Sequence, residues 1–195
     1  MLICPDLPSK STKAGQVPHT HCFICKLGPT MEDTWFAKEN GPSLKVFLTT
    51  SPLDAQKCID FVKDPGAGAV VYFGGTTRDS FGDREVVSLS YEAHRPMALR
   101  SLVKISNEAI TKFKDFRGQD SVQKVCICHR LGTVPVLEES IVIALSSTHR
   151  KEGWEAAMYI LERIKESVEI WKSEEYADGG ATWKENGKEH EKVQI

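Results

Sequence analysis

Two short runs of uncharged, mostly apolar residues constrain the fold of this chain most strongly. Residues 69–73 (Ala-Val-Val-Tyr-Phe) and 140–146 (Ser-Ile-Val-Ile-Ala-Leu-Ser) have the length of strands, and such runs are typical of strands buried on both faces. Residues 96–113 and 154–168 instead repeat apolar side chains at helical spacing. Strands and amphipathic helices are therefore mixed within one unit, and we expect an α+β or mixed α/β fold.

The remaining elements follow from local patterns. We expect further strands over residues 44–48, 86–94 and 122–129. A helix should begin at Thr50-Ser51-Pro52, where hydroxyl caps precede a proline. Gly74-Gly75 should end the strand that begins at Ala69, and residues 131–136 form a turn-rich connector.

The apolar pattern also predicts which side chains of two elements are buried and where regular structure ends. Val87 should share the buried face of the 86–94 strand, and Trp154 should begin the buried stripe of the last helix. From Trp171 onward the pattern is less regular, with a loop at residues 177–180.

The ends of the chain differ in composition from its centre. Residues 1–43 are rich in proline and lack a sustained period, so we expect a mostly disordered extension. Residues 44–184 form the folded domain, and residues 185–195 form a charged, frayed tail. Residues 19–25 gather histidines and cysteines, but with a single Cys-x-x-Cys motif they do not make a structural metal site. We assign no metal and no cofactor.

The overall composition limits the function classes. The 195 residues carry a formal net charge of −2, without the basic excess of a nucleic-acid-binding surface. The apolar runs are too short to span a membrane, and the amino terminus lacks the apolar region of a secretory signal. Six cysteines in such a chain are expected to be reduced thiols, which favours the cytosol.

Two segments carry groups suited to anions. Residues 74–78 are a glycine-rich stretch ending in Arg78, and residues 146–150 place hydroxyls, His149 and Arg150 at the start of a helix. A tight turn with a solvated arginine would account for the first, and a capped helix for the hydroxyls of the second. Positive charge is disfavoured at a helix start, which makes His149 and Arg150 a modest indication of function.

A lysine pair forms a third candidate. If the last helix continued, Lys165 and Lys172 would share one face about 10 Å apart. Lys165 sits at the edge of the apolar stripe, where a partly desolvated amine could act as a base or nucleophile. From the pattern alone, two surface lysines remain the simpler interpretation.

Six segments, in this order and spacing, resemble the molybdopterin synthase large-subunit family from about Leu44 to Lys184. They are residues 73–78 (Phe-Gly-Gly-Thr-Thr-Arg), 89–93 (Leu-Ser-Tyr-Glu-Ala), 129–136 (His-Arg-Leu-Gly-Thr-Val-Pro-Val), 146–150 (Ser-Ser-Thr-His-Arg), Lys165 with 170–172 (Ile-Trp-Lys), and 182–184 (Thr-Trp-Lys). The resemblance implies an α/β hammerhead core with an additional antiparallel β subdomain.

The resemblance also implies partners and a reaction. A homodimer of this chain would bind two small ubiquitin-like subunits, giving a heterotetramer. The carboxyl-terminal Gly-Gly thiocarboxylate of each small subunit would enter a pocket of this chain. Two such tails would convert cyclic pyranopterin monophosphate into molybdopterin by forming its dithiolene.

The resemblance implies a set of site residues, each at a position of this chain that matches the family pattern. Lys165 matches the essential lysine, and Lys172 matches a second lysine in the pocket. The substrate-binding set comprises Phe73, Arg78, His149, Arg150 and Glu174. We expect Lys165 to take the acid/base or covalent role, His149 with Arg150 to bind the phosphate, and Lys172 to steer the thiocarboxylate or stabilise its tetrahedral intermediate.

The chain departs from the family pattern at two positions. Glu169 replaces a proline, which would let the helix run on, and Ser173 replaces a lysine. Two rival functions remain open at this point: a catalytically silent scaffold of the same fold, and a phosphate-ester hydrolase that uses His149. The hydrolase lacks an evident nucleophile–base pair or metal set.

Overall fold

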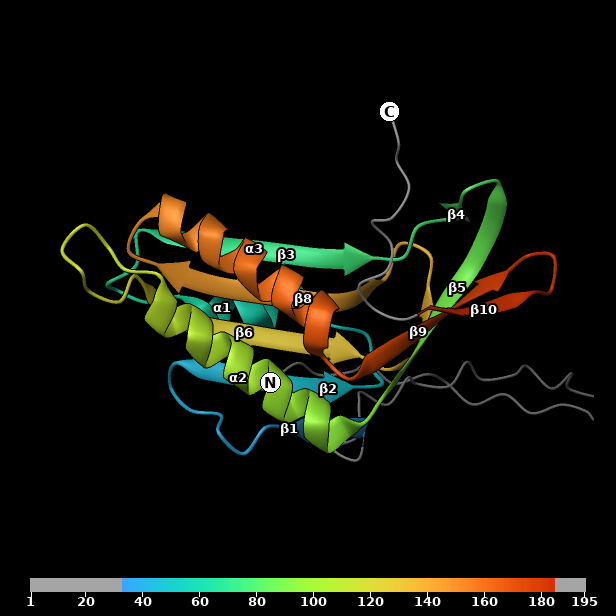
Figure 1. Ribbon diagram of the computed structural model, residues 1–195, viewed down its shortest axis with the longest axis horizontal. Coiled ribbons are helices and arrows are strands. Elements are labelled where there is room, and N and C mark those ends of the chain that lie inside the picture. The colour runs from blue at the N-terminus through green and yellow to red at the C-terminus, as the bar shows by residue number, and fades with distance from the viewer. Residues whose placement is uncertain (1–32, 185–195) are drawn as a thin grey trace, which may run out of the picture.

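A five-stranded sheet forms the centre of the computed structural model, which describes residues 33–184 (Figure 1). Its strands lie in the order β1-β2-β6-β8-β3. Their bounds are Thr34–Phe36 (β1), Leu44–Thr49 (β2), Val122–Arg130 (β6), Glu139–Ser147 (β8) and Ala69–Thr76 (β3). The pair β2–β6 is parallel and the other pairs are antiparallel. The strands expected over 44–48, 122–129 and 140–146 are confirmed.

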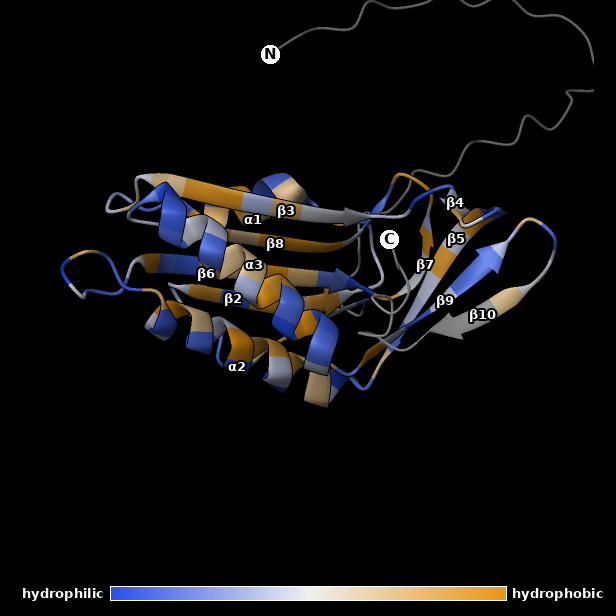
Figure 2. Ribbon diagram, turned by 45° about the horizontal axis from the view of Figure 1, so that its top comes forward, coloured by the Kyte–Doolittle hydropathy of each residue, from blue (hydrophilic) through white to orange (hydrophobic). Residues whose placement is uncertain are grey.

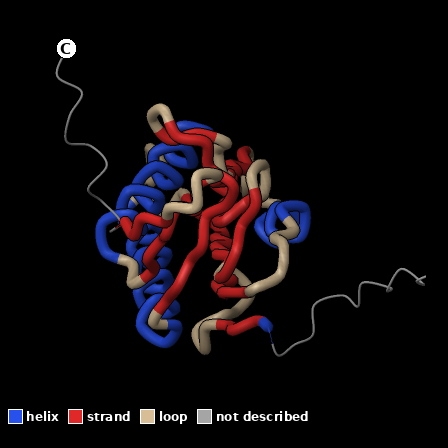
Figure 3. The backbone as a smooth tube through the Cα atoms, turned by 90° about the vertical axis from the view of Figure 1, so that its right-hand side faces the viewer, coloured by secondary structure: helices blue, strands red, loops and turns tan. Residues whose placement is uncertain are grey.

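Helices cover both faces of this sheet (Figure 3). Alternation along β6 sends Val125 and Ile127 into one core cluster, beneath α2 (Arg95–Lys112) and α3 (Arg150–Ser167). Cys126 and Cys128 point to the opposite face, where α1 (Ala55–Val62) packs. Both cysteines are buried free thiols.

A second, antiparallel sheet stands beside one end of the first (Figure 2). Its strand order is β10-β9-β5-β4, and β7 also pairs with β5. The bounds are Ala181–Lys184 (β10), Ile170–Tyr176 (β9), Arg84–Ala93 (β5), Ser80–Phe81 (β4) and Gly132–Pro135 (β7). The α+β class, with an additional antiparallel β unit, is thereby confirmed.

The start of α1 differs from the expectation. The helix begins at Ala55, and the Asp54 carboxylate accepts a hydrogen bond from the Lys57 amide at 3.1 Å. Asp54 therefore provides the cap expected at Thr50 or Ser51, because its side chain reaches a free amide of the first turn.

The glycine pair does not form a turn. Gly74 and Gly75 continue β3 and pair with Val142 and Ile141 of β8. A Cβ atom on Gly75 would lie 2.7 Å from the Ile141 Cγ2 atom, so glycine is needed there for close packing within the sheet.

Three expectations for the second sheet were wrong. Residues 132–135 form β7 rather than part of a connector, and residues 170–176 form a regular strand. Val87 is exposed because the register between β5 and β9 shifts between Val86 and Ser88. This irregularity removes Val87 from the alternation of buried and exposed side chains along β5.

The buried face of α3 also differs from the expected stripe. Its buried residues include Gly153, Ala156 and Ile160, whereas Trp154 is 62% exposed. Small residues on this face let the helix approach the sheet closely, and the larger Trp154 and Met158 share an outer face four residues apart.

The end regions named from the sequence fall mostly beyond residues 33–184. The His/Cys cluster at 19–25 and the tail at 185–195 lie outside the described residues. Residues 34–36, counted with the amino-terminal extension, form β1 against β2. Across residues 33–184, the helices are too short or too polar to cross a bilayer.

Candidate active site

A cavity of about 210 Å³ lies where the two sheets meet. Its walls come from the end of β3, the start of β8, the last turns of α3, and strands β5 and β9. The side chains that carry its chemistry are those of Phe73, Arg78, Tyr91, His129, Lys165, Lys172 and Glu174. Five of the seven site residues expected from the sequence therefore share one cavity.

Lys165 reaches the cavity from the last turn of α3. Its neighbour Ile164 is buried in the core and fixes the helix, while the Lys165 side chain is exposed in this single chain. A cation is favoured at a helix carboxyl end because the last carbonyl groups point toward it.

Lys172 reaches the same cavity from a different element. The expected continuing helix is wrong: α3 ends at Ser167 and Lys172 lies on β9, opposite Tyr91 of β5. The replacement of proline by Glu169 thus does not extend the helix. The Glu169 carboxylate instead accepts a hydrogen bond from the Ser101 hydroxyl at 2.9 Å.

Glu174 lies on the same face of β9 as Lys172, two residues further on. It is 4% exposed, lines the cavity, and accepts a hydrogen bond at 2.6 Å from the Tyr176 hydroxyl. A buried carboxylate requires such a partner, because leaving it without one carries a large desolvation penalty.

Phe73 and Arg78 line the cavity from the β3 side. Between them, Thr77 is buried and donates a hydrogen bond from its hydroxyl to the Val134 carbonyl at 3.2 Å. This anchor fixes the chain just before the exposed Arg78 side chain. Arg78, Lys165 and Lys172 bring three cations to a cavity that holds one carboxylate from this set, Glu174, so the cavity suits anionic ligands.

Sequence reasoning missed His129 and Tyr91 as cavity residues. The His129 ring is 6% exposed, its Nδ1 atom lies 2.8 Å from the Arg130 carbonyl oxygen, and it contacts Tyr91 edge-on. Burial lowers the pKa of His129 to about 4, so the imidazole is neutral at neutral pH. Both residues lie in family-like segments, which was the available signal.

His149 and Arg150 lie at the opposite end of the molecule from the cavity. They begin α3, and sixteen residues of helix separate His149 from Lys165, about 24 Å at 1.5 Å per residue. Both are exposed, and the ring of Phe116 lies 5.9 Å from that of His149. Within one chain, these two residues do not join the other five.

Comparison with known proteins gives a consistent family. The model of the family described as "MoaE protein" matches residues 48–167. The molybdopterin synthase catalytic subunit of Aspergillus oryzae is 48% identical over 139 residues, covering 71% of this chain and 74% of that protein.

Solved structures agree with this result. The crystal structure of molybdopterin synthase from Staphylococcus aureus superposes with a TM-score of 0.64 at 34% identity, covering 70% of this chain and 94% of that one. A complex of subunits 1 and 2 of the molybdopterin-converting factor from Helicobacter pylori shares the fold, with a TM-score of 0.57 at 19% identity over 74% and 91% of the two chains. The chain therefore belongs to the MoaE protein family.

Proposed function

We propose that this chain is the catalytic subunit of a molybdopterin synthase. It takes sulfur from the thiocarboxylated carboxyl terminus of a small ubiquitin-like subunit and transfers it to cyclic pyranopterin monophosphate. The observation that carries the proposal is the clustering of Arg78, Lys165 and Lys172 in one cavity. The phosphate and the thiocarboxylate are both anions, so this cavity raises the local concentration of both.

Each cavity residue has a role that follows from its position. Lys165, on the helix end, acts as acid/base or covalent catalyst, and Lys172 on β9 steers the thiocarboxylate or stabilises its tetrahedral intermediate. Arg78 supplies a further cation to an anionic group, and Phe73 forms part of the apolar wall. Glu174 is the carboxylate among these cations and keeps their side chains oriented.

The transfer balances without a redox partner. The thiocarboxylate sulfur forms a bond to a substrate carbon while a carbon–oxygen bond at that carbon breaks, and the oxygen leaves as water or stays on the opened phosphate ester. This step links the substrate to the small subunit as a thioester. Water then adds to the thioester carbonyl, and the bond between that carbon and sulfur breaks. The sulfur stays on the substrate, the small subunit leaves as a carboxylate, and a second small subunit supplies the second sulfur.

A second copy of the chain would complete the pocket with His149 and Arg150. β3 is an edge strand of the main sheet, and α3 packs over it. Val70 on β3 and the pair Trp154 and Met158 on α3 are exposed apolar side chains along this edge. Exposed edges and apolar patches of this kind favour association with another chain.

Two-fold symmetry explains how this edge brings distant residues together. β3 and α3 run in the same direction, toward the second sheet (Figure 1). A two-fold axis across the β3 edge would make both elements antiparallel to their copies. The amino end of one α3, with His149 and Arg150, would then lie beside the carboxyl end of the other, with Lys165.

The size of the cavity supports a shared pocket. Sites for small molecules commonly enclose roughly 300–1,000 Å³, and the 210 Å³ present in one chain is smaller. Walls from a second copy would enlarge and close the site. With one small subunit at each of two such pockets, the assembly would be a heterotetramer. The Helicobacter pylori complex, which contains two different subunits, supports the small partner.

The free thiols indicate the redox state of the cellular compartment. Within residues 33–184, Cys58, Cys126 and Cys128 are free and buried. Unpaired thiols are the rule in reducing compartments. We therefore place this reaction in the cytosol.

A product assay tests the function directly. The chain is incubated with thiocarboxylated small subunit and cyclic pyranopterin monophosphate, and molybdopterin is quantified. We expect product from the native chain and a loss of at least about 100-fold for Lys165→Ala, the range for removal of an acid/base group. Lys104→Ala, at an exposed site on α2, is the matched control and should keep native activity.

Two outcomes would reject the proposal. Absence of product from the native chain, while the small subunit still binds, would favour a silent scaffold. Phosphate release without sulfur transfer would favour the hydrolase. Circular dichroism of each variant verifies that a loss of product does not reflect unfolding.

A further inference from the structure

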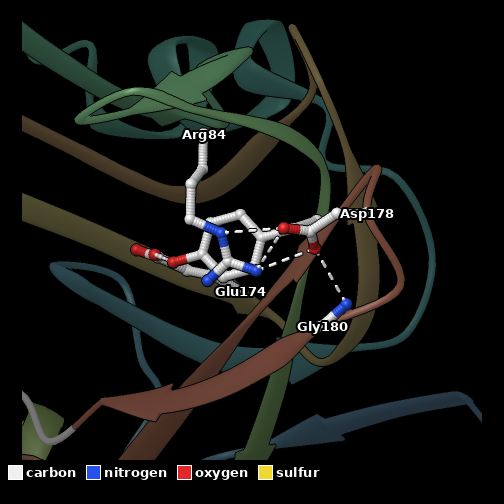
Figure 4. Close-up of polar contacts among 5 residues, drawn as sticks. Arg84, Glu174, Asp178 and Gly180 are labelled. Atoms are coloured by element: carbon white, nitrogen blue, oxygen red, sulfur yellow. Dashed lines mark hydrogen bonds and ion pairs between the residues drawn. The ribbon is translucent and has the colours of Figure 1, made fainter.

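A row of contacts leads from a surface turn to the cavity carboxylate. Arg84, at the start of β5, forms an ion pair with Asp178, with Nη2 2.8 Å from Oδ1 and Nε 3.2 Å from Oδ2 (Figure 4). Asp178 lies in the turn between β9 and β10 and also accepts a hydrogen bond at 3.0 Å from the Gly180 amide. The carboxylate is thus held from two sides, which fixes the position of the guanidinium.

The guanidinium in turn covers a buried tyrosine. The Arg84 Cζ atom lies 3.5 Å from the centroid of the Tyr176 ring, a close cation–π stack. Tyr176 is buried, and its hydroxyl donates the 2.6 Å hydrogen bond to Glu174 Oε2. A hydrogen bond to a carboxylate is stronger than one between neutral groups, and burial strengthens it further.

The position of Tyr176 separates it from the cavity itself. Lys172, Glu174 and Tyr176 alternate along β9 and share one face. Lys172 and Glu174 line the cavity, whereas Tyr176 lies behind Glu174 on the side away from Lys172. The hydroxyl of Tyr176 therefore meets the cavity through its hydrogen bond to the Glu174 carboxylate.

We propose that Tyr176 is a positioning residue for sulfur transfer, which fixes the orientation of Glu174 toward the cavity lysines, and that Arg84 with Asp178 holds the Tyr176 ring in place. The inference rests on the proposed function of this cavity. A carboxylate held at one oxygen cannot rotate freely, so it keeps the lysine ammonium groups where an incoming thiocarboxylate must meet them. Without the hydroxyl, the Glu174 side chain would adopt several orientations. The ammonium groups of the cavity lysines would then also adopt several positions.

Removal of the single hydroxyl tests this inference. Tyr176→Phe should lower kcat for sulfur transfer by about 10- to 100-fold, the equivalent of one charge-assisted hydrogen bond, with little change in KM. The matched control is Tyr159→Phe. Its hydroxyl also donates to a glutamate, Glu108 Oε2, at 2.9 Å, but this pair joins α3 to α2 and does not line the cavity. The control should keep native kcat.

A double-mutant cycle separates positioning from a general structural effect. Glu174→Ala should itself lower kcat, and adding Tyr176→Phe to it should cause no further loss, because the side chain that accepts the hydrogen bond from the hydroxyl is gone. Arg84→Ala should give a smaller loss in the same direction, and this loss should vanish in the Tyr176→Phe background. Arg84→Ala also keeps the test decisive if Tyr176→Phe fails to fold.

Native kcat in folded Tyr176→Phe would overturn the inference while leaving the function intact, and so would losses that add fully in the double mutant. Absence of product from the native chain would instead reject the proposed function. If the arginine variant is the one measured, native kcat for Arg84→Ala would overturn the role of the ion pair.

Discussion

The ring of Tyr91 lies edge-on against the imidazole of His129, with centroids 4.9 Å apart, and joins the second sheet to the first at the cavity wall. His129 is buried, and its Nδ1 atom hydrogen bonds to the Arg130 carbonyl. The imidazole at this junction of the two sheets is therefore a buried titratable group, and burial disfavours its charged form.

Stability should depend on pH through His129. Its pKa is about 4 in the folded chain against an ordinary 6.5, so the unfolded chain binds the proton more readily. The neutral His129 contributes fully to the free energy of unfolding above pH 6.5. As the pH falls from 6.5 toward 4, the free energy of unfolding decreases by a total of about 3 kcal/mol. Urea unfolding at several pH values, compared with His129→Gln, measures this slope. Parallel curves for the two proteins would contradict the prediction.

The close approach of α3 to the sheet should make Gly153 hard to replace. A Cβ atom there would overlap the Ser147 hydroxyl and lie 3.1 Å from the Val71 Cγ2 atom. Gly153→Ala should therefore lower the free energy of unfolding by about 1–3 kcal/mol, although alanine favours helices. Gly41→Ala meets nothing within 4 Å and serves as the control. A Gly153→Ala protein as stable as the wild type would show that the helix can move away without cost.

Charges on the outer face of α3 should separate the two copies. Trp154 and Met158 are 62% and 60% exposed in the single chain. In the proposed dimer they lie near the two-fold axis, where like charges would repel. Trp154→Glu combined with Met158→Glu should convert a dimer to a monomer in light scattering. Lys104→Glu, on α2, should leave the dimer intact. A charged variant that still dimerises would move the interface elsewhere.

The centre of the main sheet could be predicted from the sequence, because β6 and β8 are buried along most of their length. The run at 140–146 shows this burial directly as an uncharged stretch. The run at 69–73 was also predicted as a strand buried on both faces, but it forms the edge strand β3, where Val70 is exposed. The second sheet was harder to predict. The segment 170–176 mixes Lys172, Glu174 and Glu175 with apolar residues, so its sequence lacks a clear strand pattern. Its strand conformation depends on pairing with β5 and β10.

The site shows the same division between local and long-range information. Lys165 and Lys172 were predicted as a pair on one helix, and they do share one cavity, but from a helix and a strand. The family resemblance identified both residues, whereas helical spacing gave the wrong reason for their proximity. His129 was missed because one buried histidine in a strand has no local pattern that marks a cavity wall.

In the proposed dimer, one pocket combines Lys165 of one copy with His149 of the other. This pairing is tested by mixing Lys165→Ala and His149→Ala chains, unfolding and refolding them together, and assaying molybdopterin formation. Each variant alone should be nearly inactive. Half of the randomly formed dimers would be mixed and would contain one intact pocket, so activity should return to about one quarter of native. Mixed dimers that form, as tags on the two chains can verify, but recover no activity would contradict the shared pocket.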